Sequence, residues 1–369
     1  MKIGIDARFV GPEGTGLGKY TEKLILNLAK IDKNNKYVIF LKRDNFNYLK
    51  FSQNNFRKII ADVNWYSIEE QIKLPGIFFK EKLDLLHIPH FNVPVFYKGN
   101  FVVTIHDLIH HHFKEQSVTT KNPLLFNLKR IGYKFVVRNA VKKSLKILVP
   151  SDFVKDEIIK YFQVDPGKIM VTYEAAEEEY SGSEDKQLPK LKNTLLYVGN
   201  VYFHKNISNL INAVKILKEN KKEVRLIIVS PRDIFWQRLN KEIESRNLQG
   251  TVTLKPYQET KELVKLFSQV TAYVFPSLSE GFGIPGLNAM AASLPVIASS
   301  IPVLKEVYKD AALYFDPRDP ADIAKKIEKL LDNPKLRSDL INKGFKQVNA
   351  YSWETMARET LKVYLSAKI

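Results

Sequence analysis

The sequence predicts an α/β protein made of two doubly wound domains in series. In both halves of the chain, short apolar runs typical of buried parallel strands alternate with longer segments of helical periodicity. The two sets are separated by a polar stretch over residues 177–192, which has no apolar periodicity. Such a pattern indicates two open parallel sheets, each with helices on both faces.

The first domain is expected over residues 1–180 and the second over residues 190–350. The predicted strands of the first are Lys2–Ala7, Tyr37–Leu41, Leu85–His90, Phe101–His106, Lys146–Val149 and Ile169–Tyr173. Those of the second are Leu195–Val198, Val224–Val229, Val252–Leu254, Ala272–Phe275, Val296–Ala298 and Leu313–Phe315. Residues 351–369 are expected to form a closing helix with Ser352 as its N-cap, anchored by Trp353 and Tyr364.

The composition narrows the class of protein. At 369 residues, 45% of them hydrophobic, the chain can form two substantial cores. It has no cysteine, which excludes disulfides and thiolate metal sites. The N-terminus enters a predicted strand at once, and no apolar run is long enough to span a bilayer. We therefore expect a cytoplasmic protein.

The formal charge of +17 attracts anionic partners. The segment 116–151 has no acidic residue and interleaves apolar residues with Lys121, Lys129, Arg130, Lys134, Arg138, Lys142, Lys143 and Lys146. It is typical of a basic amphipathic helix on an anionic membrane surface. The alternative is a solvated helix face whose apolar side is core. Nucleic-acid binding is suggested by charge alone, and we expect none.

A glycine-rich turn follows the predicted strand Ala272–Phe275, and a helix is expected from Pro285 through Ala292. Gly281 and Gly283 would lie at this strand-to-helix elbow, where the backbone can approach a ligand and helix amides favour an anion. Glu280 could accept hydrogen bonds from sugar hydroxyls beside that anion. The elbow therefore suits a nucleotide-sugar. The alternative is an ordinary strand–turn–helix whose glycines only permit packing.

Another glycine-rich segment, 11–20, follows the first strand as a predicted loop before a helix. It is not a Walker A loop, because Glu13 replaces the first glycine and Tyr20 replaces the Ser or Thr. It also lacks the third glycine of a dinucleotide fingerprint after Gly16 and Gly18. The alternative is a flexible surface loop.

Histidine and lysine mark two further strand ends. Six of the seven histidines lie between His87 and His112, which places them at a ligand-binding sheet edge. His106 and His110 are four residues apart, but no further ligand set supports a metal site, and 110–112 is expected to be a solvated loop.

Lys205 is expected to open a helix, where its charge would suit a diphosphate; the alternative is a surface lysine.

Taken in order, these segments resemble the retaining glycosyltransferases of family 4, also called group 1. The matching segments, from Met1 to about Trp353, are Gly16-Leu17-Gly18-Lys19-Tyr20, Thr104-Ile105-His106-Asp107-Leu108, 149–153, 166–171, 199–206, 276–291, 295–298 and 311–320. The resemblance implies the GT-B fold, with two Rossmann-like domains facing across a cleft and the last helix returning to the first domain. The first domain would take the acceptor and the second the donor.

The resemblance also implies an activity. A hexose, with mannose or glucose as the first candidates, would pass from a nucleotide-diphosphate sugar to a glycan or lipid-linked acceptor in surface polysaccharide or glycolipid synthesis. The enzyme would be retaining and independent of metal and cofactor, and it would lie in the cytoplasm as a peripheral protein of the inner membrane face. The alternatives are a nucleotide-sugar epimerase and a non-catalytic sugar-nucleotide binder.

Site residues follow from the matched positions. The catalytic candidates are His106, Glu280 and Lys205. The donor-binding candidates are Gly16, Gly18, Gly199, Asn200, His204, Lys205, Glu280, Gly281, Phe282, Gly283, Ile284 and Asn288, and the acceptor-side candidates are Tyr20 and Asp107. Asn200 and His204 stand where many members carry arginine, so the diphosphate clamp is expected to be weaker or pH-sensitive. Asn288 stands where the family has its second glutamate, and Asn288→Glu is expected to tighten donor binding.

Overall fold

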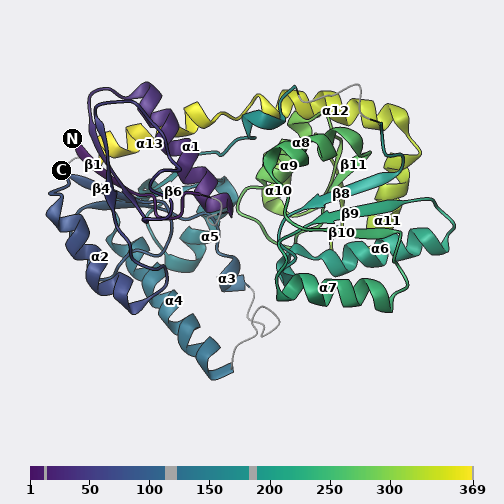
Figure 1. Ribbon diagram of the computed structural model, residues 1–369, viewed down its shortest axis with the longest axis horizontal. Coiled ribbons are helices and arrows are strands. Elements are labelled where there is room, and N and C mark those ends of the chain that lie inside the picture. The colour runs from purple at the N-terminus through teal and green to yellow at the C-terminus, as the bar shows by residue number, and fades with distance from the viewer. Residues whose placement is uncertain (12–14, 113–122, 183–188, 368–369) are drawn as a thin grey trace. The chain divides into compact units, whose positions relative to one another are not determined.

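The structure is a computed structural model that describes residues 1–11, 15–112, 123–182 and 189–367 (Figure 1). The chain divides into two compact units. Unit 1 comprises residues 1–108, 119–174 and 352–369, and unit 2 comprises residues 109–118 and 175–351. Each unit is built around its own parallel sheet. The predicted α/β class with two doubly wound domains is therefore confirmed.

Unit 1 contains a seven-stranded parallel sheet of order β3-β2-β1-β4-β5-β6-β7. Its strands are β1 Lys2–Asp6, β2 Lys36–Leu41, β3 Phe56–Ile60, β4 Leu85–Ile88, β5 Phe101–Thr104, β6 Lys146–Val149 and β7 Ile169–Val171. The chain runs from β1 toward one edge and then returns to continue from β4 toward the other. The sheet therefore has its topological switch point between β1 and β4, where open α/β sheets bind ligands beyond the carboxyl ends of the strands.

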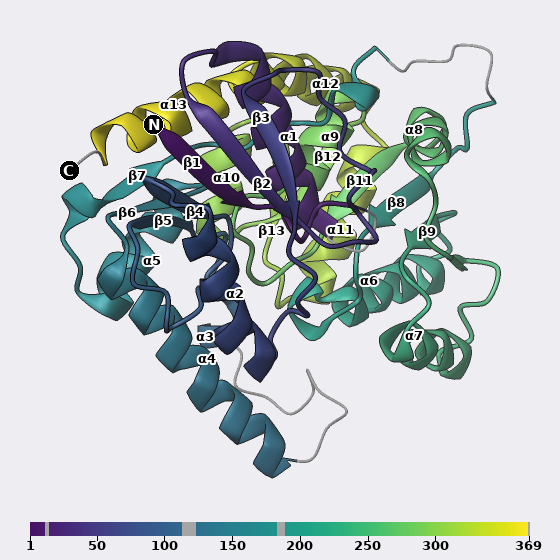
Figure 2. The ribbon, with the colours of Figure 1, turned by 60° about the vertical axis from the view of Figure 1, so that its left-hand side comes forward.

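Helices cover both faces of this sheet (Figure 2). They are α1 Thr15–Ile31, α2 Ile68–Lys80, α4 Pro123–Lys143, α5 Asp152–Phe162 and α13 Trp353–Ser366, with the short η3 Pro166–Lys168. Leu74 of α2, Val137 of α4 and Ile158 of α5 belong to one buried cluster with the strands, so these three helices share a face. On the other face α1 packs against α13.

Unit 2 contains a six-stranded parallel sheet of order β10-β9-β8-β11-β12-β13. Its strands are β8 Thr194–Val198, β9 Arg225–Val229, β10 Val252–Lys255, β11 Ala272–Phe275, β12 Val296–Ser299 and β13 Ala312–Phe315. Its helices are α3 Ile109–His112, α6 Ile207–Glu219, α7 Ile234–Ser245, α8 Thr260–Gln269, α9 Ile284–Ala291, α10 Pro302–Tyr308, α11 Pro320–Leu331 and α12 Pro334–Val348, with η4 Glu178–Tyr180 and η5 Phe203–Lys205. The switch point lies between β8 and β11.

All twelve predicted strands are present, with ends that differ by at most two residues. The structure adds β3, which the sequence did not reveal because it lies at the sheet edge and only Phe56 among its five residues is buried. The closing helix is also confirmed. The Ser352 side chain caps α13 by accepting from the backbone N–H groups of Glu354 and Thr355, and both Trp353 and Tyr364 are buried in unit 1.

Three local predictions are wrong. Gly16 and Gly18 lie in the first turns of α1 rather than in a loop, and 110–112 belongs to the short helix α3. Lys205 ends η5 instead of opening a helix, because Asn206 takes a left-handed conformation before α6 begins at Ile207. Residues 12–14, 116–122 and 183–188, with the side chains of 123–129, lie outside the described residues, and so do the predictions that concern them, including Glu13, Lys121 and Lys129.

Candidate functional site

In unit 2 the sequence-predicted residues Lys205 and Glu280 meet at the switch point of the sheet. Lys205 Nζ lies 2.7 Å from Glu280 Oε1, and both side chains are mostly buried. Their loops follow β8 and β11, which are paired strands, and the Leu278 N–H donates to the His204 carbonyl at 2.7 Å. A cation and a carboxylate are thus held together where an open α/β sheet binds its ligand.

The elbow after Glu280 is tightly packed. Gly283 has φ +107°, and a Cβ there would lie 2.5 Å from the Tyr308 hydroxyl, which donates to the Gly283 carbonyl. Phe282 is buried, and its ring stands edge-on to Tyr351. Gly281 and Ile284 stay partly exposed beside the first turn of α9. Backbone conformation and packing therefore both require glycine at position 283. This agrees with the interpretation that the glycines permit packing, and it is also compatible with an anion site at the start of α9.

Asn288 has a partner that the sequence did not indicate. Its Oδ1 accepts the Glu177 backbone N–H at 2.8 Å, and its Nδ2 donates to Glu177 Oε1 at 3.1 Å. Asn288 is buried on α9, while Glu177 is partly exposed. The side-chain amide thus fixes both the backbone and the carboxylate of Glu177, and a carboxylate stands beside position 288 although the residue itself is neutral.

The remaining unit 2 candidates line the turn after β8. Gly199 has φ +149°, and the Asn200 carbonyl accepts the Tyr197 hydroxyl at 2.6 Å. Burial, aided by the neighbouring Lys205 charge, lowers the pKa of His204 to about 4. His204 is therefore neutral near pH 7, and a pH-sensitive clamp through this residue is not expected.

In unit 1, His106 lies just beyond β5 and is partly exposed. Its Nδ1 lies 3.0 Å from Glu174 Oε1 and its Nε2 lies 3.1 Å from the Pro89 carbonyl oxygen. Contacts at both ring nitrogens thus fix the orientation of the imidazole. Tyr20 stands edge-on to the His106 ring at 4.6 Å between centroids. Glu174 carried no recognisable sequence signal, because only the fold brings it to β5.

Behind His106 lies a buried hydrogen-bonded chain. The Tyr20 hydroxyl and Thr104 Oγ1 are 3.2 Å apart, and His87 Nε2 is 2.7 Å from the same Thr104 oxygen. His87 Nδ1 is 2.6 Å from the Tyr364 hydroxyl of α13. Burial lowers the pKa of His87 to about 3, so this ring is neutral. Tyr20 is itself buried and so contacts His106 rather than the surface.

The other unit 1 candidates are placed separately. A Cβ at Gly18 would lie 2.3 Å from the Phe9 carbonyl oxygen, so glycine lets α1 approach the loop after β1, whereas Gly16 has no such neighbour. Asp107 is partly exposed next to His106. A surface hollow lined by residues such as Lys2, Lys36 and Arg57 lies at the opposite, amino-terminal end of the strands.

Within the described ranges, no group of three or more His, Asp or Glu side chains is placed to hold a metal ion. Among the helices so described, none has the length and apolar character needed to cross a bilayer.

The fold and these strand-end residues define a class of protein, the two-domain α/β enzymes of the GT-B type. Two family models match: "Glycosyl transferases group 1" over residues 182–347 and "Glycosyltransferase Family 4" over residues 16–179. The chain belongs to the group 1 glycosyltransferases of family 4, and it is a transferase. The predicted family is thereby confirmed.

Individual relatives agree with this assignment. The chain is 27% identical over 94% of its length to the O-antigen chain mannosyltransferase RfbU of Salmonella typhimurium, of which it covers 95%. It is 30% identical over 69% of its length to the O-antigen chain mannosyltransferase B of Escherichia coli, of which it covers 71%. Sucrose-phosphate synthase from Thermosynechococcus elongatus shares the fold with a TM-score of 0.80 at 18% identity, covering 99% of this chain and 98% of that one.

Proposed function

We propose that this glycosyltransferase moves a hexose, with mannose as the first candidate, from a nucleotide-diphosphate sugar to a glycan or lipid-linked acceptor. The products would serve surface polysaccharide or glycolipid synthesis. The observation that carries the proposal is the Lys205–Glu280 pair at the switch point of unit 2. The names of two relatives as O-antigen chain mannosyltransferases support mannose and the polysaccharide pathway.

The chemistry requires stabilisation of the leaving group. The bond between the anomeric carbon and the diphosphate oxygen breaks while the acceptor oxygen attacks from the same face, and the acceptor proton passes to the departing phosphate oxygen. Lys205 would neutralise the charge that develops on the diphosphate, with help from the backbone amides of Gly283 and Ile284. Glu280 would orient sugar hydroxyls, and His106 would contact the sugar. This route retains the anomeric configuration and needs no bound metal.

The donor test is direct. A ligand at a hundred times its dissociation constant stabilises a protein by about 2.7 kcal/mol, so thermal shifts with GDP-, UDP- and ADP-sugars identify the donor. Transfer or donor hydrolysis is then followed by proton NMR, which also reads the anomeric configuration of the product. We expect activity in excess EDTA and an α-linked product from an α-linked donor. Inversion, or strict dependence on magnesium or manganese, would contradict the mechanism.

A non-catalytic binder is the second candidate, since Asn288 replaces the family's second glutamate. Such a protein would bind the donor in the thermal-shift screen. It would neither hydrolyse the donor without acceptor nor transfer the sugar to any acceptor. The two assays together therefore separate the enzyme from the binder.

Peripheral membrane association completes the proposal. Ile131, Phe135, Arg138 and Lys142 follow one another at helical spacing on α4, and all four side chains are exposed. Ile68, Ile72 and Phe79 are exposed on α2, which covers the same face of the sheet. Apolar side chains beside basic ones suit an anionic lipid surface, where the apolar groups insert and the cations contact headgroups.

A further inference from the structure

A cluster of aromatic side chains lies beyond the carboxyl ends of β1 and β4 in unit 1. Phe9 follows β1 and His90 follows β4, and their ring centroids are 5.2 Å apart. Trp65 and Tyr66 come from the connection between β3 and α2. Trp65 stacks on Phe9 at 4.3 Å, and Tyr66 stands edge-on to His90 at 5.8 Å. The cluster therefore occupies the switch point of the sheet, where a ligand is expected.

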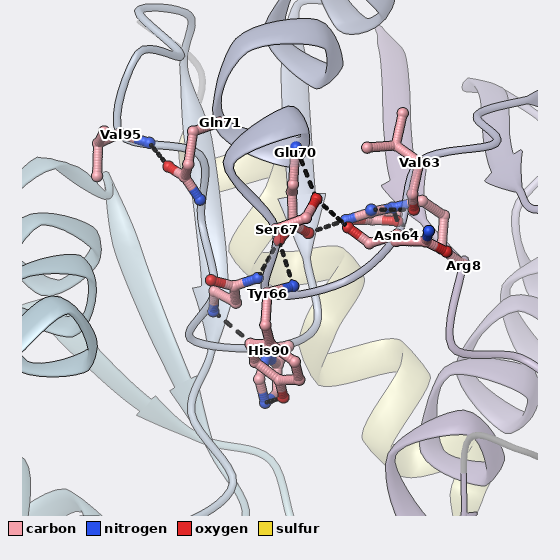
Figure 3. Close-up of polar contacts among 11 residues, drawn as sticks. Arg8, Val63, Asn64, Tyr66, Ser67, Glu70, Gln71, His90 and Val95 are labelled. Carbon is pink, nitrogen blue, oxygen red and sulfur yellow. Dashed lines mark hydrogen bonds and ion pairs between the residues drawn. The ribbon is translucent and has the colours of Figure 1, made fainter. Parts of the chain in front are cut away.

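A rigid polar network supports the cluster (Figure 3). Arg8 is fully buried and donates to Asp6 Oδ2 at 2.8 Å and to Glu70 Oε1 at 2.6 Å. Glu70 Oε2 accepts from Asn92 Nδ2 at 2.5 Å and from the Tyr66 backbone N–H at 2.8 Å. Burial raises the pKa of Glu70, and the Arg8 guanidinium opposes that change. A buried ion network whose members are mutually bonded holds its neighbours in one geometry.

That network holds Tyr66 in an unusual position. Tyr66 has φ +57°, a conformation that costs energy for a bulky residue, and yet its side chain is 64% exposed. His90 Nδ1 accepts the Asn92 N–H at 3.3 Å, so His90 Nε2 carries the proton that faces the Tyr66 hydroxyl oxygen at 3.4 Å. The backbone is thus strained at a residue whose ring contacts His90 and Phe91 on one side and leaves most of its surface open to solvent.

Trp65 supplies a second observation. Its indole Nε1 is buried, and no acceptor in the described part of the chain lies within hydrogen-bond reach. Its ring faces already have neighbours, since Phe9 stacks on it and Lys42 Nζ lies 4.9 Å from its centroid. A buried donor without an acceptor requires an explanation, and a hydroxyl group of a ligand is one.

We infer that Tyr66, His90 and Trp65 form a subsite for a pyranose ring of the acceptor glycan. The exposed Tyr66 ring would stack on the apolar C–H face of the sugar, His90 would hold that ring in place from its edge, and the Trp65 indole would hydrogen-bond a sugar hydroxyl. A ring that combines an apolar face with hydroxyl edges matches this set of groups. The inference rests on the proposed function, because it assigns the sugar to the acceptor side of the same enzyme.

The test measures sugar binding apart from catalysis. Dissociation constants for α-mannotriose, maltotriose and chitotriose are determined by saturation-transfer NMR on the intact protein. At least one should bind the wild type, and Tyr66→Ala should weaken its binding roughly tenfold or more, whereas Tyr66→Phe should retain it. Tyr161→Ala, which removes a 43% exposed tyrosine of α5, is the matched control and should change nothing.

The subsite would be overturned if no trisaccharide binds the wild type, or if Tyr66→Ala binds a trisaccharide as tightly as the wild type does. The donor thermal shift is measured on every variant and should stay unchanged. If Tyr66→Ala loses the donor thermal shift, the Tyr66 ring contacts the nucleotide-sugar instead of the acceptor. That result would also overturn the subsite. Failure of the proposed function has a different outcome, in which the wild type neither binds nor turns over any donor.

Discussion

At residue scale, Asn288 and Glu177 form the most specific feature of the proposed donor side. The amide group holds a carboxylate and its backbone N–H together. A glutamate at 288 would place a second carboxylate against Glu177 and would lack the donor that now binds Glu177 Oε1. The expectation that a restored glutamate tightens donor binding therefore has to be revised.

We predict that Asn288→Glu lowers the free energy of unfolding by about 1–3 kcal/mol, the usual range for a broken buried hydrogen bond. Donor binding should weaken as well. Glu177→Gln in the same chain should recover much of the loss, because its amide can donate to the carboxylate introduced at position 288. Denaturant unfolding and donor titration of the two single variants and the double variant measure this coupling. A stable Asn288→Glu protein with tighter donor binding would show that Glu177 is a dispensable neighbour.

Lys205 gives a second residue-scale prediction. Lys205→Ala should reduce turnover roughly a hundredfold or more, because a preorganised charge beside the leaving group is lost. Lys205→Arg keeps the charge and should retain more activity. Lys215→Ala on α6 removes an exposed lysine paired with Glu219 and serves as the control. The unfolding midpoint is measured in parallel, since Glu280 loses its cation. Unchanged turnover of Lys205→Ala would show that Lys205 does not act in the site.

At element scale, the sequence predicted the sheets well and their edges less well. Strands such as Ala272–Phe275 are buried on both faces and form continuous apolar runs, which sequence alone reveals. Strand β3 was not predicted, because it is a short edge strand whose apolar residues are interrupted by charged ones. Glu174 and Glu177 could not be predicted as site residues, because their partners lie 68 and 111 positions away in the chain.

The exposed face of α4 and α2 supports an element-scale prediction. Lys134, Arg138 and Lys142 are exposed, and changing all three to Gln should weaken binding to anionic vesicles. Each cation contributes up to about 1 kcal/mol near anionic lipid, so wild-type binding should also disappear at high salt. Phe135→Ser should also weaken binding at low salt, because an exposed apolar side chain that would insert into the lipid is lost.

The control for this prediction changes the charge equally elsewhere. Lys325, Lys329 and Lys335 are exposed in unit 2, and their replacement by Gln should leave vesicle binding unchanged. Flotation with neutral and anionic vesicles measures all variants. Wild-type protein that stays in solution with anionic vesicles at low salt would identify α4 as a solvated helix.

At the scale of the whole molecule, stability should depend on pH through its buried neutral histidines. The pKa of His87 falls from the ordinary value near 6.5 to about 3 in the folded state. Protonation therefore favours the unfolded chain, so the stabilisation is present above pH 6.5 and is lost progressively toward pH 3. The slope is up to about 1.4 kcal/mol per pH unit for one group. His204 adds to it, since its pKa is about 4.

Urea unfolding between pH 7.5 and pH 4 measures this dependence. His87→Gln should be less stable at neutral pH and should show a shallower acid slope, because glutamine can hydrogen-bond but cannot titrate in this range. A wild-type free energy of unfolding that stays level from pH 7 to pH 4 would contradict a neutral buried His87.

The bond between His87 and Tyr364 joins residues 277 positions apart, and α13 completes the core of unit 1. During synthesis, strands β1 to β7 emerge first, yet α1 lacks its partner helix until unit 2 has been made. Domains usually fold in the order of their synthesis. For the final step this order does not hold, because all of unit 2 precedes α13 in the chain and the apolar face of α1 stays uncovered until α13 has been made. The apolar side of α1 is therefore uncovered longest, although it belongs to the part of the chain that is made first.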